Sequence, residues 1–253
     1  MTSTCKHGLD LPKREEKPRS NGVTMVMDKG LSFRQAEDLV DSCGHIIDFV
    51  KLGFGTSIFT NRADEKIALY KKSGIHPYLG GTLFEAFIKQ NKFDQYRSLL
   101  DRWKLDTVEV SDGSLAIPTE EKCKYISILA KDHIVLSEVG SKDAKKEILA
   151  ENWVSMMQTE LEAGSFLVIA EAREGGNVGI CMSDGSIHVS LIDAIFASIP
   201  EEKVLWEAPM KAQQIWFIKR FGNNVNLGNI AQNEVVALET LRNGLRGDTF
   251  HLF

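Results

Sequence analysis

Eight short apolar runs recur along the chain, and most of them end in charged residues or in glycine. Buried parallel strands have this near-continuous apolar character, and glycine commonly bounds them. A fold that must bury eight such strands has few solutions, so this repetition constrains the architecture more than any single motif. The runs cover residues 23–30, 45–55, 75–81, 106–113, 133–140, 165–173, 203–209 and 223–230.

The segments between these runs repeat their apolar residues at helical spacing. Ser32 is a suitable N-cap for one helix, Thr119 for another, and Gly164 is placed to end a third. Strands that alternate with helices predict a (β/α)8 barrel, with a doubly wound sheet as the alternative. Since no linker or duplication interrupts the pattern, we expect a flexible polar leader over residues 1–18 and one barrel domain over residues 19–253.

Composition excludes several classes of partner. The chain has 253 residues, 43% of them hydrophobic, which suits a single barrel domain. A net charge of -5, with scattered Lys and Arg, predicts no nucleic-acid partner. The lack of a long apolar run and of a signal-peptide pattern predicts no membrane association, and isolated cysteines predict reduced thiols in the cytoplasm. A homo-oligomer stays open, because Trp216 and Phe217 would pack either an interface or the barrel wall.

Charged side chains gather where the predicted strands end, which in a barrel is the catalytic face. Charge buried at such a place is costly unless it is paired or binds a metal. Carboxylates favour Mg²⁺, and cations there favour an anionic substrate. The candidate metal ligands are Asp28, Glu109, Glu138, Glu171 and Glu207, and the candidate cations are Lys29, Lys51 and Arg173.

Two glycine-containing segments are weaker signals, and for each of them both a functional and a purely structural role stay open. GFGTS, at residues 53–57, lacks the glycine spacing of a dinucleotide loop, so it is either an anion-cradling loop or a tight turn. REGGNVG, at residues 173–179, is either a mobile lid or a plain surface loop. The histidines show no zinc-binding spacing.

Taken together, the strand-end motifs resemble the phosphosulfolactate synthase family, from about residue 23 to residue 250. The motifs that carry the resemblance are MDKG, DFVKLGFGTS, YLGGTLFE, VEVSDGS, LSEVGSK, IAEARE, WEAP, VNLGNI and LETLRNGLRGDTF. The resemblance implies a (β/α)8 barrel that adds sulfite to phosphoenolpyruvate and forms (2R)-3-phosphosulfolactate with Mg²⁺. In archaea this reaction opens a route to coenzyme M.

The resemblance also implies roles for individual residues. Lys142 matches the lysine expected to protonate C2 of an enolate-type intermediate, and the five carboxylates would supply the metal ligands. Of the neighbours Asp28 and Lys29, only one need point into the barrel, because adjacent strand residues face opposite ways; we expect Lys29 to bind the substrate anion. Many barrels bind phosphate beside their last two strands, where the candidates are Lys211, Gln213, Asn229 and Arg246.

Two other functions fit the same residues. One is a different barrel enzyme that uses phosphoenolpyruvate or another phosphometabolite, including an aldolase with a Schiff-base lysine. The other is a non-catalytic barrel that only binds a phosphometabolite. Borohydride trapping would identify the aldolase, and binding without turnover would identify the non-catalytic protein.

Overall fold

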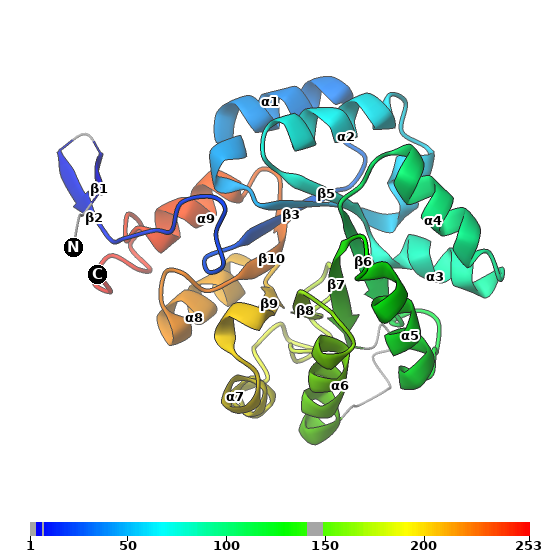
Figure 1. Cartoon of the computed structure of the whole chain (residues 1–253). Coiled ribbons are helices and arrows are strands. Elements are labelled where there is room, and N and C mark those ends of the chain that lie inside the picture. Colours follow the sequence, from blue (N-terminus) through cyan, green and yellow to red (C-terminus); the bar gives the residue numbers. More distant parts are fainter. Residues whose placement is uncertain (1–3, 7, 141–148) are drawn as a thin grey trace.

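The computed structural model describes residues 4–6, 8–140 and 149–253, and Figure 1 shows strands that alternate with helices around a central barrel. The parallel strands pair in the order β5-β4-β3-β10-β9-β8-β7-β6, and the two end strands, β5 and β6, lie against each other. The predicted (β/α)8 barrel is therefore confirmed, and the doubly wound alternative is wrong. The strands are β3 (Thr24–Asp28), β4 (Phe49–Leu52), β5 (His76–Leu79), β6 (Thr107–Ser111), β7 (Ile134–Val139), β8 (Leu167–Ala170), β9 (Val204–Glu207) and β10 (Leu227–Ala231).

Helices cover the outside of the barrel. Ser32 caps the first of them as predicted, since its side chain accepts from the Gln35 backbone N–H and the Gln35 side chain accepts in return. At Thr119 the prediction was one residue late, because Pro118 takes the N-cap position and Thr119 is already helical. The helices are α1 (Phe33–Cys43), α2 (Ala63–Lys72), α3 (Gly81–Lys89), α4 (Phe93–Arg102), α5 (Thr119–Leu129), α6 (Ala150–Glu162), α7 (Val189–Ser198), α8 (Lys211–Phe221) and α9 (Val235–Arg242). No helix within the described ranges is long and apolar enough to cross a membrane.

The core has an inner and an outer layer, and strand alternation assigns residues to them. On β3, Met25 and Met27 pack inside the barrel, whereas Val26 belongs to the layer between strands and helices. Phe217 is buried in the outer layer and stacks on Trp206 at a centroid distance of 5.3 Å. Phe217 therefore packs the barrel wall.

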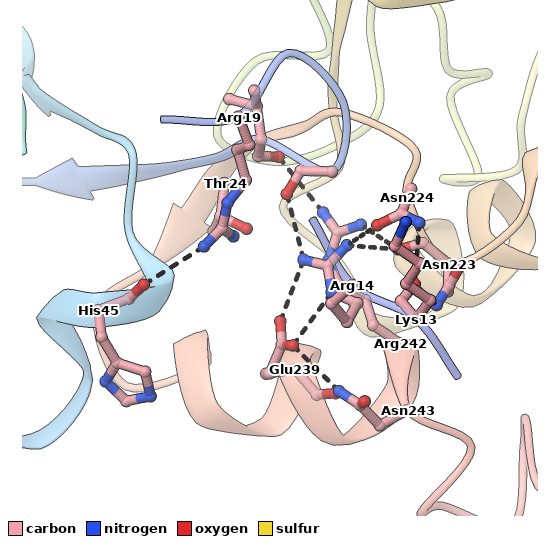
Figure 2. Close-up of polar contacts among 12 residues, drawn as sticks. Lys13, Arg14, Arg19, Thr24, His45, Asn223, Asn224, Glu239, Arg242 and Asn243 are labelled. Atoms are coloured by element: carbon pink, nitrogen blue, oxygen red, sulfur yellow. Dashed lines mark hydrogen bonds and ion pairs between the residues drawn. The ribbon is translucent and has the colours of Figure 1, made fainter. Parts of the chain in front are cut away.

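The predicted leader begins with a hairpin of β1 (Thr4–Lys6) and β2 (Leu9–Leu11), and the chain then runs against the end of the barrel where the strands begin. Arg14 is the centre of the contacts there (Figure 2). Its guanidinium pairs with Glu239 at 3.0 Å and donates to the Asn223 carbonyl at 2.9 Å and the Asn224 side chain at 2.6 Å. The boundary at residue 18 stays a prediction, but these contacts attach part of the leader to the barrel.

Replacement of Arg14 by Ala should lower the free energy of unfolding by about 2–3 kcal/mol, because half-buried acceptors and the Glu239 carboxylate would lose their charged donor. Urea denaturation checks this. Lys13→Ala is the control, since the Lys13 side chain is exposed and only its backbone carbonyl is used. Equal stability of the two variants would show that the Arg14 contacts do not stabilise the barrel.

Candidate active site

A cavity of about 400 Å³ opens at the carboxyl ends of the strands. Its walls combine carboxylates, two cations, an asparagine pair and the start of helix α3. This is the face on which barrel enzymes carry their active sites. The lining residues are Met27, Lys51, Phe54, Gly80, Gly81, Thr82, Glu138, Glu171, Arg173, Glu174, Gly175, Asn177, Glu207 and Asn229.

Lys51 lies at the centre of the charged residues. Its Nζ is 2.8 Å from Glu138 Oε2, 3.0 Å from Glu109 Oε2 and 3.7 Å from Glu207 Oε1. These side chains come from four different strands, β4, β7, β6 and β9, so closure of the barrel is what brings them together. Lys51 is 8% exposed, and each of the three carboxylates is less so.

Burial and charge act in opposite directions on these groups. Burial raises the pKa of Glu109 to about 7, although the Lys51 ammonium opposes the shift. Burial also raises the pKa of Glu207 above its ordinary value. Burial alone would lower the pKa of Lys51, but the surrounding carboxylates outweigh it and hold that pKa well above the usual range. The cavity therefore holds a protonated Lys51 among three carboxyl groups, those of Glu109, Glu138 and Glu207.

The start of helix α3 forms one wall, a feature that the sequence reasoning missed. The Gly81 N–H donates to Glu109 Oε1 at 2.5 Å and so orients that carboxylate toward Lys51. A Cβ on Gly81 would lie 2.2 Å from Ser111 Oγ and 2.6 Å from Glu109 Oε1, which leaves no room for a side chain. The doubled glycine of YLGGT, directly after a strand, was the available signal.

Gly81→Ala should destabilise the protein by about 1–3 kcal/mol through overpacking and should reduce any activity of the cavity, since Glu109 must move. Thermal unfolding and turnover measure the two effects. Gly247→Ala is the control, because no atom lies within 4 Å of a Cβ built there. A Gly81→Ala variant with native stability would mean that the α3 wall adjusts freely.

The loop between β8 and α7 supplies the second cation. Arg173 lines the cavity, is exposed, and has a left-handed backbone with φ 53°. Its guanidinium is placed on the wall of the cavity beside Glu174 and Asn177 of the same loop. Lys29 does not line the cavity; its ammonium pairs with Glu174 on the same loop, at the rim.

Of the four predicted phosphate ligands, only Asn229 lines the cavity. Asn229 is left-handed, with φ 57°, where the β10–β3 register shifts, and its Nδ2 donates to Glu207 Oε2 at 3.2 Å. Lys211 instead pairs with Asp248 at 2.6 Å. Gln213 is buried and bonds to backbone groups, and Arg246 is half-buried and does not line the cavity. The structure does not bring these three to the cavity.

Asp28 does not join the cavity carboxylates either. Its side chain follows Val26 onto the outer side of β3, where Oδ2 meets Lys66 Nζ at 2.8 Å and the Tyr70 hydroxyl at 3.0 Å. Oδ1 accepts the backbone N–H groups of Gly30 and Leu31. Asp28 thus joins β3 to helix α2, and its use as a metal ligand loses its geometric basis.

Lys142, the predicted proton donor, lies outside the described residues. Among the residues that are described, no group of three or more His, Cys, Asp and Glu side chains is arranged to hold a metal ion. Glu109, Glu138 and Glu207 are arranged around an ammonium instead. Mg²⁺ is commonly bound through only one or two carboxylates together with substrate oxygens, so Glu138, Glu171 and Glu207 on the cavity wall fit such a shared site.

Comparison with known proteins gives consistent results. A family model described as (2R)-phospho-3-sulfolactate synthase (ComA) matches residues 12–248. Phosphosulfolactate synthase of Methanothermobacter thermautotrophicus is 41% identical over 94% of this chain and 95% of its own length. The protein of the same name from Bacillus subtilis is 40% identical over 96% of this chain and 98% of its own length.

Solved structures agree on the fold. A 3-hexulose-6-phosphate synthase structure superposes with a TM-score of 0.53 at 15% identity, and the match covers 87% of this chain and 98% of that one. At such identity the likeness concerns the barrel alone. The family match and the 40–41% identity over nearly the whole chain carry more, and they show that this chain belongs to the phosphosulfolactate synthase family.

Proposed function

We propose that the protein catalyses the addition of sulfite to C3 of phosphoenolpyruvate, which gives (2R)-3-phosphosulfolactate. The observation that carries the proposal is the Lys51 ammonium among buried carboxylates at the mouth of a barrel of this family, with Arg173 beside it. A cavity of about 400 Å³ suits a small, highly charged substrate.

In the proposed reaction the sulfur lone pair of sulfite forms the bond to C3 and the C2=C3 π bond breaks. The released electron pair spreads into the substrate carboxylate, and a proton delivered to one face of C2 completes the product. The growing negative charge requires fixed positive charge nearby. Arg173, at the cavity mouth, is suited to hold a phosphate or carboxylate through two parallel hydrogen bonds.

Mg²⁺ would be held by one or two of the wall carboxylates Glu138, Glu171 and Glu207 together with substrate oxygens, and when bound it would supply a Lewis acid for the carboxylate dianion. Asn229 fixes one oxygen of Glu207, and the Ala172 N–H donates to the same carboxylate at 3.0 Å. Lys142 remains the proposed proton donor on the family resemblance alone.

The charges around Lys51 oppose the aldolase alternative for that residue. A Schiff-base lysine must attack as a neutral amine, and it is usually activated by a lowered pKa. The neighbouring carboxylates instead raise the pKa of Lys51. Borohydride treatment with substrate should therefore trap nothing at Lys51.

The direct test mixes the protein with phosphoenolpyruvate, sulfite and Mg²⁺ and follows phosphosulfolactate by ³¹P NMR. We expect product that is abolished by EDTA and strongly reduced in Lys142→Ala. Product that persists in Lys142→Ala would keep the reaction and assign the proton donor elsewhere. A folded protein that binds phosphoenolpyruvate without forming product would favour the non-catalytic alternative.

A further inference from the structure

Both polar atoms of the Gln213 side chain form hydrogen bonds, Nε2 with one loop and Oε1 with the start of its own helix. Gln213 is 1% exposed, near the start of α8. Its Nε2 lies 2.7 Å from the Gly176 carbonyl, 3.1 Å from the Gly185 carbonyl and 3.3 Å from Cys181 Sγ. Its Oε1 accepts the Met210 N–H at 3.1 Å. All three groups that face Nε2 belong to residues 172–188, which we call the β8–α7 loop.

The β8–α7 loop is attached to the β9–α8 unit at two places. At its start the Ala172 N–H donates to Glu207 on β9, and further along Gln213 binds the Gly176 and Gly185 carbonyls from α8. Arg173 lies between these two attachments.

Close packing restricts the backbone conformation of the β8–α7 loop at two of its glycines. Gly179 has a left-handed backbone, and a Cβ there would lie 1.9 Å from the Glu171 carbonyl oxygen. A Cβ on Gly176 would lie 2.6 Å from Gln213 Nε2. The backbone of the loop thus fits directly against the Gln213 amide, and the left-handed turn that presents Arg173 is formed within the segment so held.

We propose that Gln213 is a positioning residue: it holds the β8–α7 loop over the cavity so that Arg173 meets the anionic substrate. The proposal rests on the proposed function, because it takes phosphoenolpyruvate as the anion. It replaces the expectation that Gln213 binds the substrate phosphate itself. A methionine at this position keeps the length of the side chain and removes its donors together with the acceptor for the Met210 N–H.

The test compares Gln213→Met with Gln214→Met. Gln214 is the matched control, since it is buried on the same helix and its Nε2 donates to the Ala208 carbonyl, which is not part of the loop. In Gln213→Met, amide hydrogen exchange within residues 172–188 should become faster, and KM for phosphoenolpyruvate should rise by at least about tenfold with a smaller change in kcat. Gln214→Met should show neither change.

A double variant identifies the route of the effect. If Gln213 acts through Arg173, Gln213→Met should raise KM little further in an Arg173→Met background, because the two changes are not additive. Additive effects, or exchange in the loop at the native rate, would overturn the proposal. The exchange measurement and the calorimetric Kd for phosphoenolpyruvate need no turnover. They therefore decide the role of Gln213 even if sulfite proves to be the wrong co-substrate.

Discussion

Replacement of Lys51 by Met is expected to reduce turnover by about 10²–10³-fold, because a pre-organised positive charge at the centre of the cavity is removed. The same change should lower the free energy of unfolding by about 3–5 kcal/mol near neutral pH, as is typical when one partner of a buried ion pair is lost. Glu109 and Glu138 would face each other without the ammonium that now lies within 3.0 Å of both.

The loss should depend on pH, and its sign follows from Glu109. Burial raises the folded-state pKa of this group to about 7, above its ordinary value. A raised folded-state pKa means that the contribution of the group to stability is complete below the unfolded pKa and is lost as the pH rises through the folded one. Without Lys51, whose charge lowers the pKa of Glu109, that loss extends to higher pH and becomes larger.

Urea denaturation in EDTA at about pH 5 and about pH 8 should therefore show a gap between wild type and Lys51→Met that widens at the higher pH. Lys131→Met, at an exposed lysine, is the control for loss of one positive charge. A gap of equal size at both pH values would contradict this explanation. It would mean that loss of Lys51 does not change the folded-state protonation of the surrounding carboxylates.

The barrel was predictable because each strand carries its own evidence. A strand buried on both faces must be almost wholly apolar, and the helix after it must repeat its apolar residues at helical spacing. Both signals occur together at each of the eight strand-and-helix units. Strand ends were less predictable. The apolar run at residues 45–55 contains only four strand residues, Phe49–Leu52, since its flanks form the 3₁₀ turns Gly44–Ile46 and Gly53–Ile58.

Site residues were predictable as a set at the strand ends, but not always by direction or partner. Because adjacent strand residues face opposite ways, one of Asp28 and Lys29 had to point out of the barrel interior. Nothing in the strand sequence indicated that Asp28 would pair with Lys66 and Tyr70 on α2. Gln213 was misassigned for a similar reason. Its partners are backbone carbonyls of a loop about thirty residues earlier, and backbone groups leave no signature in the sequence.

Asp28→Asn should cost about 3–5 kcal/mol of stability, because the change removes the counter-charge of a buried ammonium. Lys66 is 1% exposed, and its Nζ lies 2.8 Å from Asp28 Oδ2. An asparagine that keeps Oδ1 for the Gly30 and Leu31 N–H groups must place its amide nitrogen against that ammonium and the Tyr70 hydroxyl. The new amide nitrogen would then be a hydrogen-bond donor that faces two other donors, the Lys66 ammonium and the Tyr70 hydroxyl.

The variant also separates a structural Asp28 from a metal-binding one. If Asp28 only joins β3 to α2, the folded fraction of Asp28→Asn should keep the Mg²⁺ dependence proposed for the wild type. The double variant Asp28→Asn/Lys66→Met should then lose less stability than the two single variants lose when added together. Urea denaturation of the four proteins gives the coupling energy, and Mg²⁺ titration of turnover gives the metal dependence. A Mg²⁺ requirement shifted by about tenfold or more would return Asp28 to the metal site, because loss of a ligand or of its support has that size of effect.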